Sequence, residues 1–182
     1  HWRFLQSLLQ EKTPLKVLNL FGYTGIASLI AAQNNAHVTH VDASKKAINW
    51  AKENQVFSGL TKKPIRWICE DAMKFVLREE RRKNSYDIIL LDPPAYGRGT
   101  HNEVWKFFDD IAQMLHTCSR ILSPQACAVI LTSYSIRASC FALHELMREV
   151  FSYRGGRIES GELVLQAQSN SCLLYTSPSP RD

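Results

Sequence analysis

Two glycines, Gly22 and Gly25, stand in a short segment that follows an apolar run at residues 16–20 and precedes a helix-like stretch. Glycine lets the backbone approach a ligand closely, and the first N–H groups of a following helix can donate to that ligand. Thr24 could cap the helix. A dinucleotide fingerprint would also need glycine at position 20, where Leu20 stands, so a pyrophosphate ligand is disfavoured. The segment therefore indicates either a small-ligand site or a purely structural turn.

Two carboxylates follow the next two predicted strands. Asp42 comes after the run at 37–41, about 20 residues beyond the glycines, where an acid can accept from the hydroxyls of a ribose. Asp71 follows the run at 65–69, where its side chain could accept from an adenine amino group while the backbone of Ala72 faces the ring. Each acid could instead cap the helix that follows. Because ligands of parallel sheets bind at the carboxyl edge, the two acids together predict an adenosine pocket.

The most specific motif begins at Asp92, directly after a predicted buried strand, and continues through Pro93 and Pro94 to Tyr96. Neither proline has an N–H, so their carbonyls and the Asp92 carboxylate would form a wall of acceptors suited to a substrate N–H. Tyr96 offers a ring on which a nucleobase could stack, for roughly 1–3 kcal/mol. A plain proline turn is the alternative. We predict these four residues as the catalytic site.

Strand-like and helix-like segments alternate along the chain and would position these groups. Helices are predicted from the glycine turn to residue 33 and at 44–57, 71–83, 104–122 and 139–151. Strands are predicted at 16–20, 37–41, 65–69, 86–91, 126–132 and 158–165. Continuous apolar strands that alternate with helices imply a parallel sheet with both faces covered. The predicted fold class is α/β, with a Rossmann-like, doubly wound and mostly parallel sheet.

The composition fits one globular domain, since 45% of the 182 residues are hydrophobic and 21% are charged. The longest apolar runs fall far short of the roughly 20 residues that a membrane span needs. Five cysteines are scattered without zinc-type spacing, which indicates reduced thiols in a cytoplasmic protein and no metal site. The net charge of +5 permits a nucleic-acid partner without requiring one.

We expect residues 1–168 to form the domain and residues 169–182 to form a disordered or non-native tail. The tail carries Ser, Pro and Asn without a period, and Pro178 and Pro180 cannot join a central strand. Residues 173–182 also resemble translated sequencing-adapter sequence. His1 stands where an initiating methionine would, so we expect a missing N-terminal part and a fold that is incomplete at both ends.

Five ordered motifs resemble those of the class I S-adenosylmethionine-dependent methyltransferases, particularly the branch similar to large-subunit ribosomal RNA methyltransferases. The motifs lie at 17–25, 41–44, 70–72, 92–99 and 131–135. The resemblance implies the class I fold, methyltransferase activity of EC class 2.1.1, S-adenosylmethionine as cofactor and ribosomal RNA as partner. It also implies that the cofactor is bound by Asn19, Phe21, Gly22, Thr24, Gly25, Asp42, Ala43, Asp71, Ala72 and Asp92.

Cysteine placement separates two kinds of methyl transfer. Methylation of pyrimidine C5 requires a cysteine that first adds to the ring, whereas an amine needs only an acceptor for its proton. In cytosine-C5 relatives that cysteine follows the strand matching 126–132, and residues 132–135 contain none. Cys127 is expected inside the buried strand and Cys140 on the next helix. The sequence therefore favours direct transfer to a nucleobase amine or another heteroatom.

Three other functions remain open at this stage, because fold does not fix function. One is an NAD-dependent oxidoreductase, against which Leu20 argues. Another is an RNA-binding module that holds the cofactor without catalysis. The third is a methyltransferase for proteins or small molecules, which the same residues would serve.

Overall fold

The computed structural model describes residues 2–10, 14–134 and 136–162. In chain order the elements are α1 (Trp2–Leu8), β1 (Lys16–Leu20), α2 (Ile26–Gln33), β2 (His37–Asp42), α3 (Lys45–Phe57), β3 (Ile65–Cys69), α4 (Ala72–Arg81), β4 (Ile88–Leu91), β5 (Tyr96–Arg98), β6 (Val104–Lys106), α5 (Phe107–Arg120), β7 (Ala128–Leu131), α6 (Cys140–Phe151) and the 3₁₀ turn η1 (Ser152–Arg154). The chain divides into two compact units, 1–137 and 138–182.

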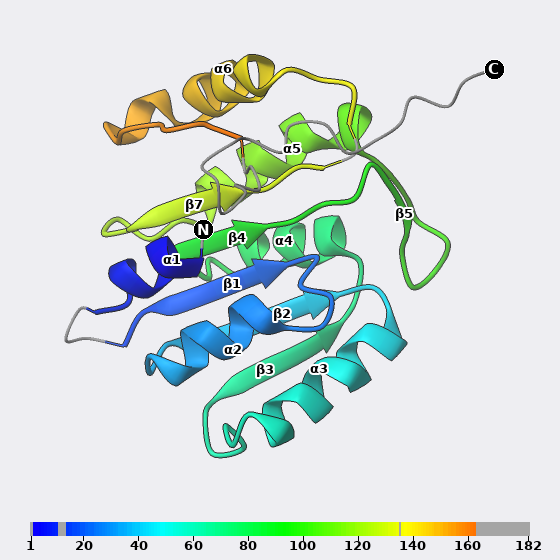
Figure 1. The fold of residues 1–182 in the computed structure, drawn as a ribbon. Helices are drawn as coiled ribbons and strands as arrows, with labels where there is room; N and C mark the ends of the chain where they lie inside the picture. Colours follow the sequence, from blue (N-terminus) through cyan, green and yellow to red (C-terminus); the bar gives the residue numbers. More distant parts are fainter. Residues whose placement is uncertain (1, 11–13, 135, 163–182) are drawn as a thin grey trace, which may run out of the picture. The chain divides into compact units, whose positions relative to one another are not determined.

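The first unit is built on a five-stranded sheet in the order β3-β2-β1-β4-β7 (Figure 1). All neighbouring strands in this sheet are parallel. The chain winds outward from β1 in both directions, so the strand order reverses beside β1. Open parallel sheets bind ligands at such a point, beyond the carboxyl ends of the strands. The predicted Rossmann-like α/β class is confirmed.

Helices of the first unit cover both faces of this sheet (Figure 1). Successive side chains of a strand point to opposite faces, so Val17 of β1 and Val38 of β2 face the same way. They pack in one apolar cluster with Leu5 of α1 and with Ala31 and Ala32 of α2. Figure 1 places α4 and α5 on the opposite face. Burial on both faces explains why β4 is wholly apolar and why β1 is apolar at positions 17, 18 and 20.

The hairpin of β5 and β6 replaces the start of a predicted helix. Residues 104–122 were expected to be helical throughout, but Val104–Lys106 pairs antiparallel with β5 and α5 begins at Phe107. Trp105 explains the difference, because its side chain is buried and its indole N–H donates to the carbonyl oxygen of Pro94 at 2.8 Å. This contact holds residue 105 in the hairpin beside the Asp92 loop.

Two further expectations about strands need correction. Residues 126–132 were expected to form a buried strand, but β7 is half-buried along its length, since it is the last strand of the described sheet and has only β4 beside it. Residues 158–162 form no strand, because they have no pairing partner among the described residues. The rest of that predicted strand and the predicted tail at 169–182 lie outside the described residues.

The second unit contains α6 and η1 within its described part, 138–162. Ser139 caps α6 by accepting a hydrogen bond from the N–H of Ala142 at 3.2 Å. In neither unit does the described part contain a helix long and apolar enough to cross a membrane.

Candidate functional site

The turn between β1 and α2 has a contorted backbone. Phe21, Tyr23 and Gly25 adopt positive φ angles of 56°, 46° and 84°. Gly25 is the N-cap of α2, and no described side chain caps this helix. The predicted cap by Thr24 is therefore wrong, because the helix begins one residue too late for Thr24 to occupy the N-cap position. The first N–H groups of α2 are left without a capping side chain, as at many helix ends that bind an anion.

Asp42 ties this turn to the end of β2. One carboxylate oxygen accepts from the N–H of Tyr23 at 2.8 Å, and the other accepts from the N–H of Ser44 at 2.8 Å. Ser44, not Asp42, caps α3, since its hydroxyl accepts from the N–H of Ala47. Each oxygen of a carboxylate can accept more than one hydrogen bond, so Asp42 retains acceptor capacity for a ligand hydroxyl. Ala43 follows it on the half-buried connection to α3.

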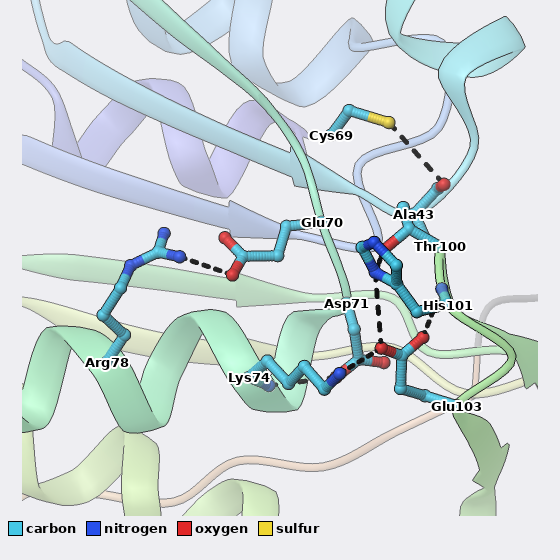
Figure 2. Close-up of polar contacts among 9 residues, drawn as sticks. All are labelled: Ala43, Cys69, Glu70, Asp71, Lys74, Arg78, Thr100, His101 and Glu103. Carbon is cyan, nitrogen blue, oxygen red and sulfur yellow. Dashed lines mark hydrogen bonds and ion pairs between the residues drawn. The ribbon is translucent and has the colours of Figure 1, made fainter.

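Asp71 is the N-cap of α4, so the capping alternative raised by the sequence is realised. Its Oδ1 accepts from the N–H of Lys74 at 2.9 Å, and Ala72 begins the helix. Lys74 in turn forms an ion pair with Glu103 at the tip of the β5–β6 hairpin (Figure 2). The hydrogen bond from Lys74 lowers the pKa of Glu103 to about 2. These contacts hold the hairpin tip beside the N-terminus of α4.

The Asp92 loop is braced from two sides. The Asp92 carboxylate accepts a hydrogen bond from the hydroxyl of Thr132, the residue that follows β7. Asp92 remains exposed, whereas Pro93 is buried. The expected wall of proline carbonyls needs correction, since the Pro94 carbonyl already accepts from Trp105. The Tyr96 side chain is 53% exposed, which leaves its ring accessible for stacking.

The structure thus gathers the predicted groups at one edge of the sheet. Asp42 is the last residue of β2, Asp71 and Asp92 follow the carboxyl ends of β3 and β4, and the glycine turn follows β1 between them. Phe21 of the turn contacts Trp105 of the hairpin, with ring centroids 4.9 Å apart. This edge therefore combines backbone N–H donors, three carboxylates and exposed aromatic rings.

Three buried polar residues lie beneath the turn; Asn19 was predicted to bind the cofactor, whereas Ser28 and His40 were missed by the sequence interpretation. The Asn19 amide nitrogen donates to the Ser28 hydroxyl at 2.9 Å, and that hydroxyl lies 2.9 Å from Nδ1 of His40. Asn19 is 3% exposed, and Ser28 and His40 are both 0% exposed. Burial lowers the pKa of His40 to about 4, so the ring is neutral near pH 7. The available signal was Asn19, a polar residue between the apolar Leu18 and Leu20 of β1.

The structure describes four of the five cysteines, Cys69, Cys118, Cys127 and Cys140. Cys127 is half-buried and precedes β7, so its expected place inside a buried strand is wrong. Cys140 begins α6, as expected. Burial raises the pKa of the Cys118 thiol to about 12, which makes it a poor nucleophile. Within the described residues no cluster of His, Cys, Asp and Glu is arranged to hold a metal ion.

Comparison with known proteins places the chain in a family. The family model described as "Conserved hypothetical protein 95" matches residues 4–144. The chain belongs to this family. The match covers the sheet, the glycine turn and all three carboxylates of the edge.

The known proteins that this chain resembles include methyltransferases. A crystal structure described as the SAM-dependent methyltransferase from Agrobacterium tumefaciens is 64% identical, with a TM-score of 0.81 over 83% of this chain and 49% of that one. A curated relative from Shewanella frigidimarina, ribosomal RNA large subunit methyltransferase K/L, is 38% identical over 125 residues, which are 67% of this chain and 17% of the relative. This chain thus spans about a sixth of that relative's length.

A more distant structure shares the fold alone. Magnesium protoporphyrin IX methyltransferase from Synechocystis PCC 6803, solved with bound SAM, is 13% identical, with a TM-score of 0.58 over 82% of this chain and 68% of that one. The resemblance to class I methyltransferases stated from the motifs is confirmed. The comparisons do not favour an oxidoreductase.

Proposed function

We propose that this protein is an S-adenosylmethionine-dependent methyltransferase that modifies ribosomal RNA at a nucleobase amine or another heteroatom. The observation that carries the proposal is that Asp42, Asp71 and Asp92 lie at one edge of the sheet, around the glycine turn. The helix that follows this turn, α2, has no capping side chain. The 64% identity to a protein described as a SAM-dependent methyltransferase supports the cofactor, and the curated relatives support the RNA. The predicted cytoplasmic location stays a prediction.

The residues at this edge fit the parts of S-adenosylmethionine. The uncapped N–H groups at the start of α2 suit its carboxylate, and the amide oxygen of Asn19 suits its ammonium group. Asp42 has acceptor capacity for the ribose hydroxyls. Asp71 uses one oxygen to cap α4 and has another for the adenine amino group, with Ala72 beside it.

The cofactor would supply an activated methyl group on a positively charged sulfur, and the protein would align the nucleophile with it. Alignment alone can lower a barrier by roughly 7–11 kcal/mol. Thr132 fixes the Asp92 carboxylate, which can accept a hydrogen bond from a substrate N–H. Methylation of the substrate nitrogen would release its proton, which Asp92 or water would accept. Tyr96 would stack on the target base.

Nucleobase nitrogen is a better target than pyrimidine C5 for this site. Residues 132–134, which border Asp92, contain no cysteine to add to the ring. The hydrogen bond to Asp92 would be charge-assisted, about 1.5–3 kcal/mol, and could offset much of the cost of flipping the base.

Two measurements test the proposal. Calorimetry should detect binding of S-adenosylhomocysteine and not of NAD. The affinity for S-adenosylhomocysteine should fall in Asp42→Asn. It should not change in the control Gly156→Ala, because the added Cβ meets no described atom within 4 Å. Tritiated methyl groups should then reach ribosomal RNA as an N-methylated or other heteroatom-methylated nucleoside. Asp92→Asn should lower the methylation rate much more than the cofactor affinity. Tight NAD binding would overturn the cofactor assignment, and 5-methylcytosine would overturn the chemistry.

A further inference from the structure

A polar layer interrupts the apolar face of the sheet under α2. Asn19 of β1 and His40 of β2 are register partners, so their side chains share the face on which Val17 and Val38 pack under the same helix. Both polar residues are at most 3% exposed. Burying polar groups in an apolar layer costs free energy unless they are hydrogen-bonded, and an apolar pair would continue the core here. The polar layer lies directly before the glycine turn, at the ligand edge.

The direction of the hydrogen bonds in this layer follows from the placement of the Asn19 amide. The Asn19 amide nitrogen donates to Ser28 Oγ, and the hydroxyl proton of Ser28 is then available for Nδ1 of His40. If His40 donated from Nδ1 instead, the Ser28 proton would have no acceptor among the described residues. The neutral His40 ring therefore accepts at Nδ1 and carries its proton on Nε2, which has no partner in the described part of the chain.

Tight packing keeps these groups in place. The His40 ring lies against Trp67, with ring centroids 4.7 Å apart. On the other side is Gly22, where an added Cβ would lie 2.3 Å from His40 Cε1 and 2.9 Å from Asn19 Nδ2. Gly22 therefore packs closely against both the ring and the amide.

We propose that Ser28 and His40 are positioning residues that orient the Asn19 amide, so that its oxygen is presented to the ammonium group of an amino-acid-bearing ligand. This inference rests on the proposed function, since the ligand would be the methionine end of the cofactor. No described residue donates to the Asn19 oxygen, which leaves it for the ligand. The buried Nε2 of His40 has no partner among the described residues, so the layer costs stability, and a positioning role would account for that cost.

Two ligands separate this role from a general structural one. S-Adenosylhomocysteine carries the amino-acid end, and 5′-methylthioadenosine has the same nucleoside without it. In Ser28→Ala, calorimetry should show affinity for the first ligand falling by about tenfold, roughly 1.4 kcal/mol, with affinity for the second unchanged. His40→Leu should act in the same way, whereas His40→Gln, which restores an oxygen acceptor, should recover part of the loss. Alanine is a strong helix former, so Ser28→Ala should fold.

Thr117→Val is the matched control, because it removes another fully buried hydroxyl, which bonds within α5 to the carbonyl of Gln113. It should leave the affinity of both ligands unchanged. Equal weakening of both ligands in Ser28→Ala would overturn the positioning role while leaving the proposed function intact. An unchanged affinity for both ligands would also overturn it. If the unmodified protein bound neither ligand, the proposed function itself would fail and this inference with it.

Discussion

Replacing Gly22 with alanine should damage both stability and cofactor binding, although Gly22 does not have a positive φ angle. The added Cβ would lie 2.3 Å from Cε1 and 2.6 Å from Nδ1 of His40, whereas ordinary contacts begin at 3.4 Å. The ring or the turn must therefore move by about 1 Å, and overpacking of this kind costs about 1–3 kcal/mol. For a chain of this size each kcal/mol corresponds to roughly 2–4 °C, so Tm should fall by roughly 2–12 °C.

Thermal unfolding and calorimetry with S-adenosylhomocysteine measure the two effects. Gly156→Ala is the control for the effect of alanine on the backbone. Gly156 does not have a positive φ angle, and no described atom lies within 4 Å of the added Cβ. His40→Ala should remove the clash, so the double variant Gly22→Ala/His40→Ala should lose less stability than the sum of the two single variants. A Tm equal to that of Gly156→Ala, or strict additivity, would refute the steric argument.

Three further predictions concern single groups. Between pH 6.5 and 4, His40 binds a proton in the unfolded state but stays neutral in the folded state, because burial lowers its pKa to about 4. The free energy of unfolding should therefore fall by up to roughly 3 kcal/mol as the pH drops through this range. Urea unfolding should detect this loss in the unmodified protein but not in His40→Gln. Tyr86→Phe removes a hydrogen bond at 2.7 Å to the buried carboxylate of Glu79, which should cost about 1–3 kcal/mol in the same assay, and an unchanged midpoint would contradict it. Asp42→Asn leaves a single acceptor oxygen for two backbone N–H groups, so Tm should fall. The variant should also bind S-adenosylhomocysteine about tenfold more weakly. An affinity equal to that of the wild type would argue against a contact between Asp42 and the ribose.

The sequence was sufficient to predict the sheet and most of its helices. All four residues of β4 are apolar, as are Val17, Leu18 and Leu20 of β1, because helices cover both faces, and this pattern is visible without a structure. The β5–β6 hairpin could not be predicted, since three-residue strands carry no periodic signal. The sequence around Trp105 fits a helix, and its place in the hairpin depends on the hydrogen bond from its indole N–H to the Pro94 carbonyl.

The buried layer of Asn19, Ser28 and His40 could not be predicted for a different reason. Asn19 meets His40 only because β1 and β2 pair in parallel in one register, and Ser28 joins them only through the packing of α2. Local sequence contains none of this information. A shift of one residue in the register would turn His40 to the other face of the sheet.

The acids at the sheet edge suggest that helix capping and ligand binding need not be alternatives. Asp42 is held by two backbone N–H groups and Asp71 by one, so each carboxylate is fixed before a ligand arrives. Thr132 fixes Asp92 by a side-chain hydrogen bond. A group that is already ordered loses less conformational entropy on binding, and an oxygen that accepts one hydrogen bond can still accept another. Hydrogen bonds that look purely structural, from the backbone to Asp42 and Asp71 and from Thr132 to Asp92, are therefore the means by which this fold would position three acceptors around one ligand.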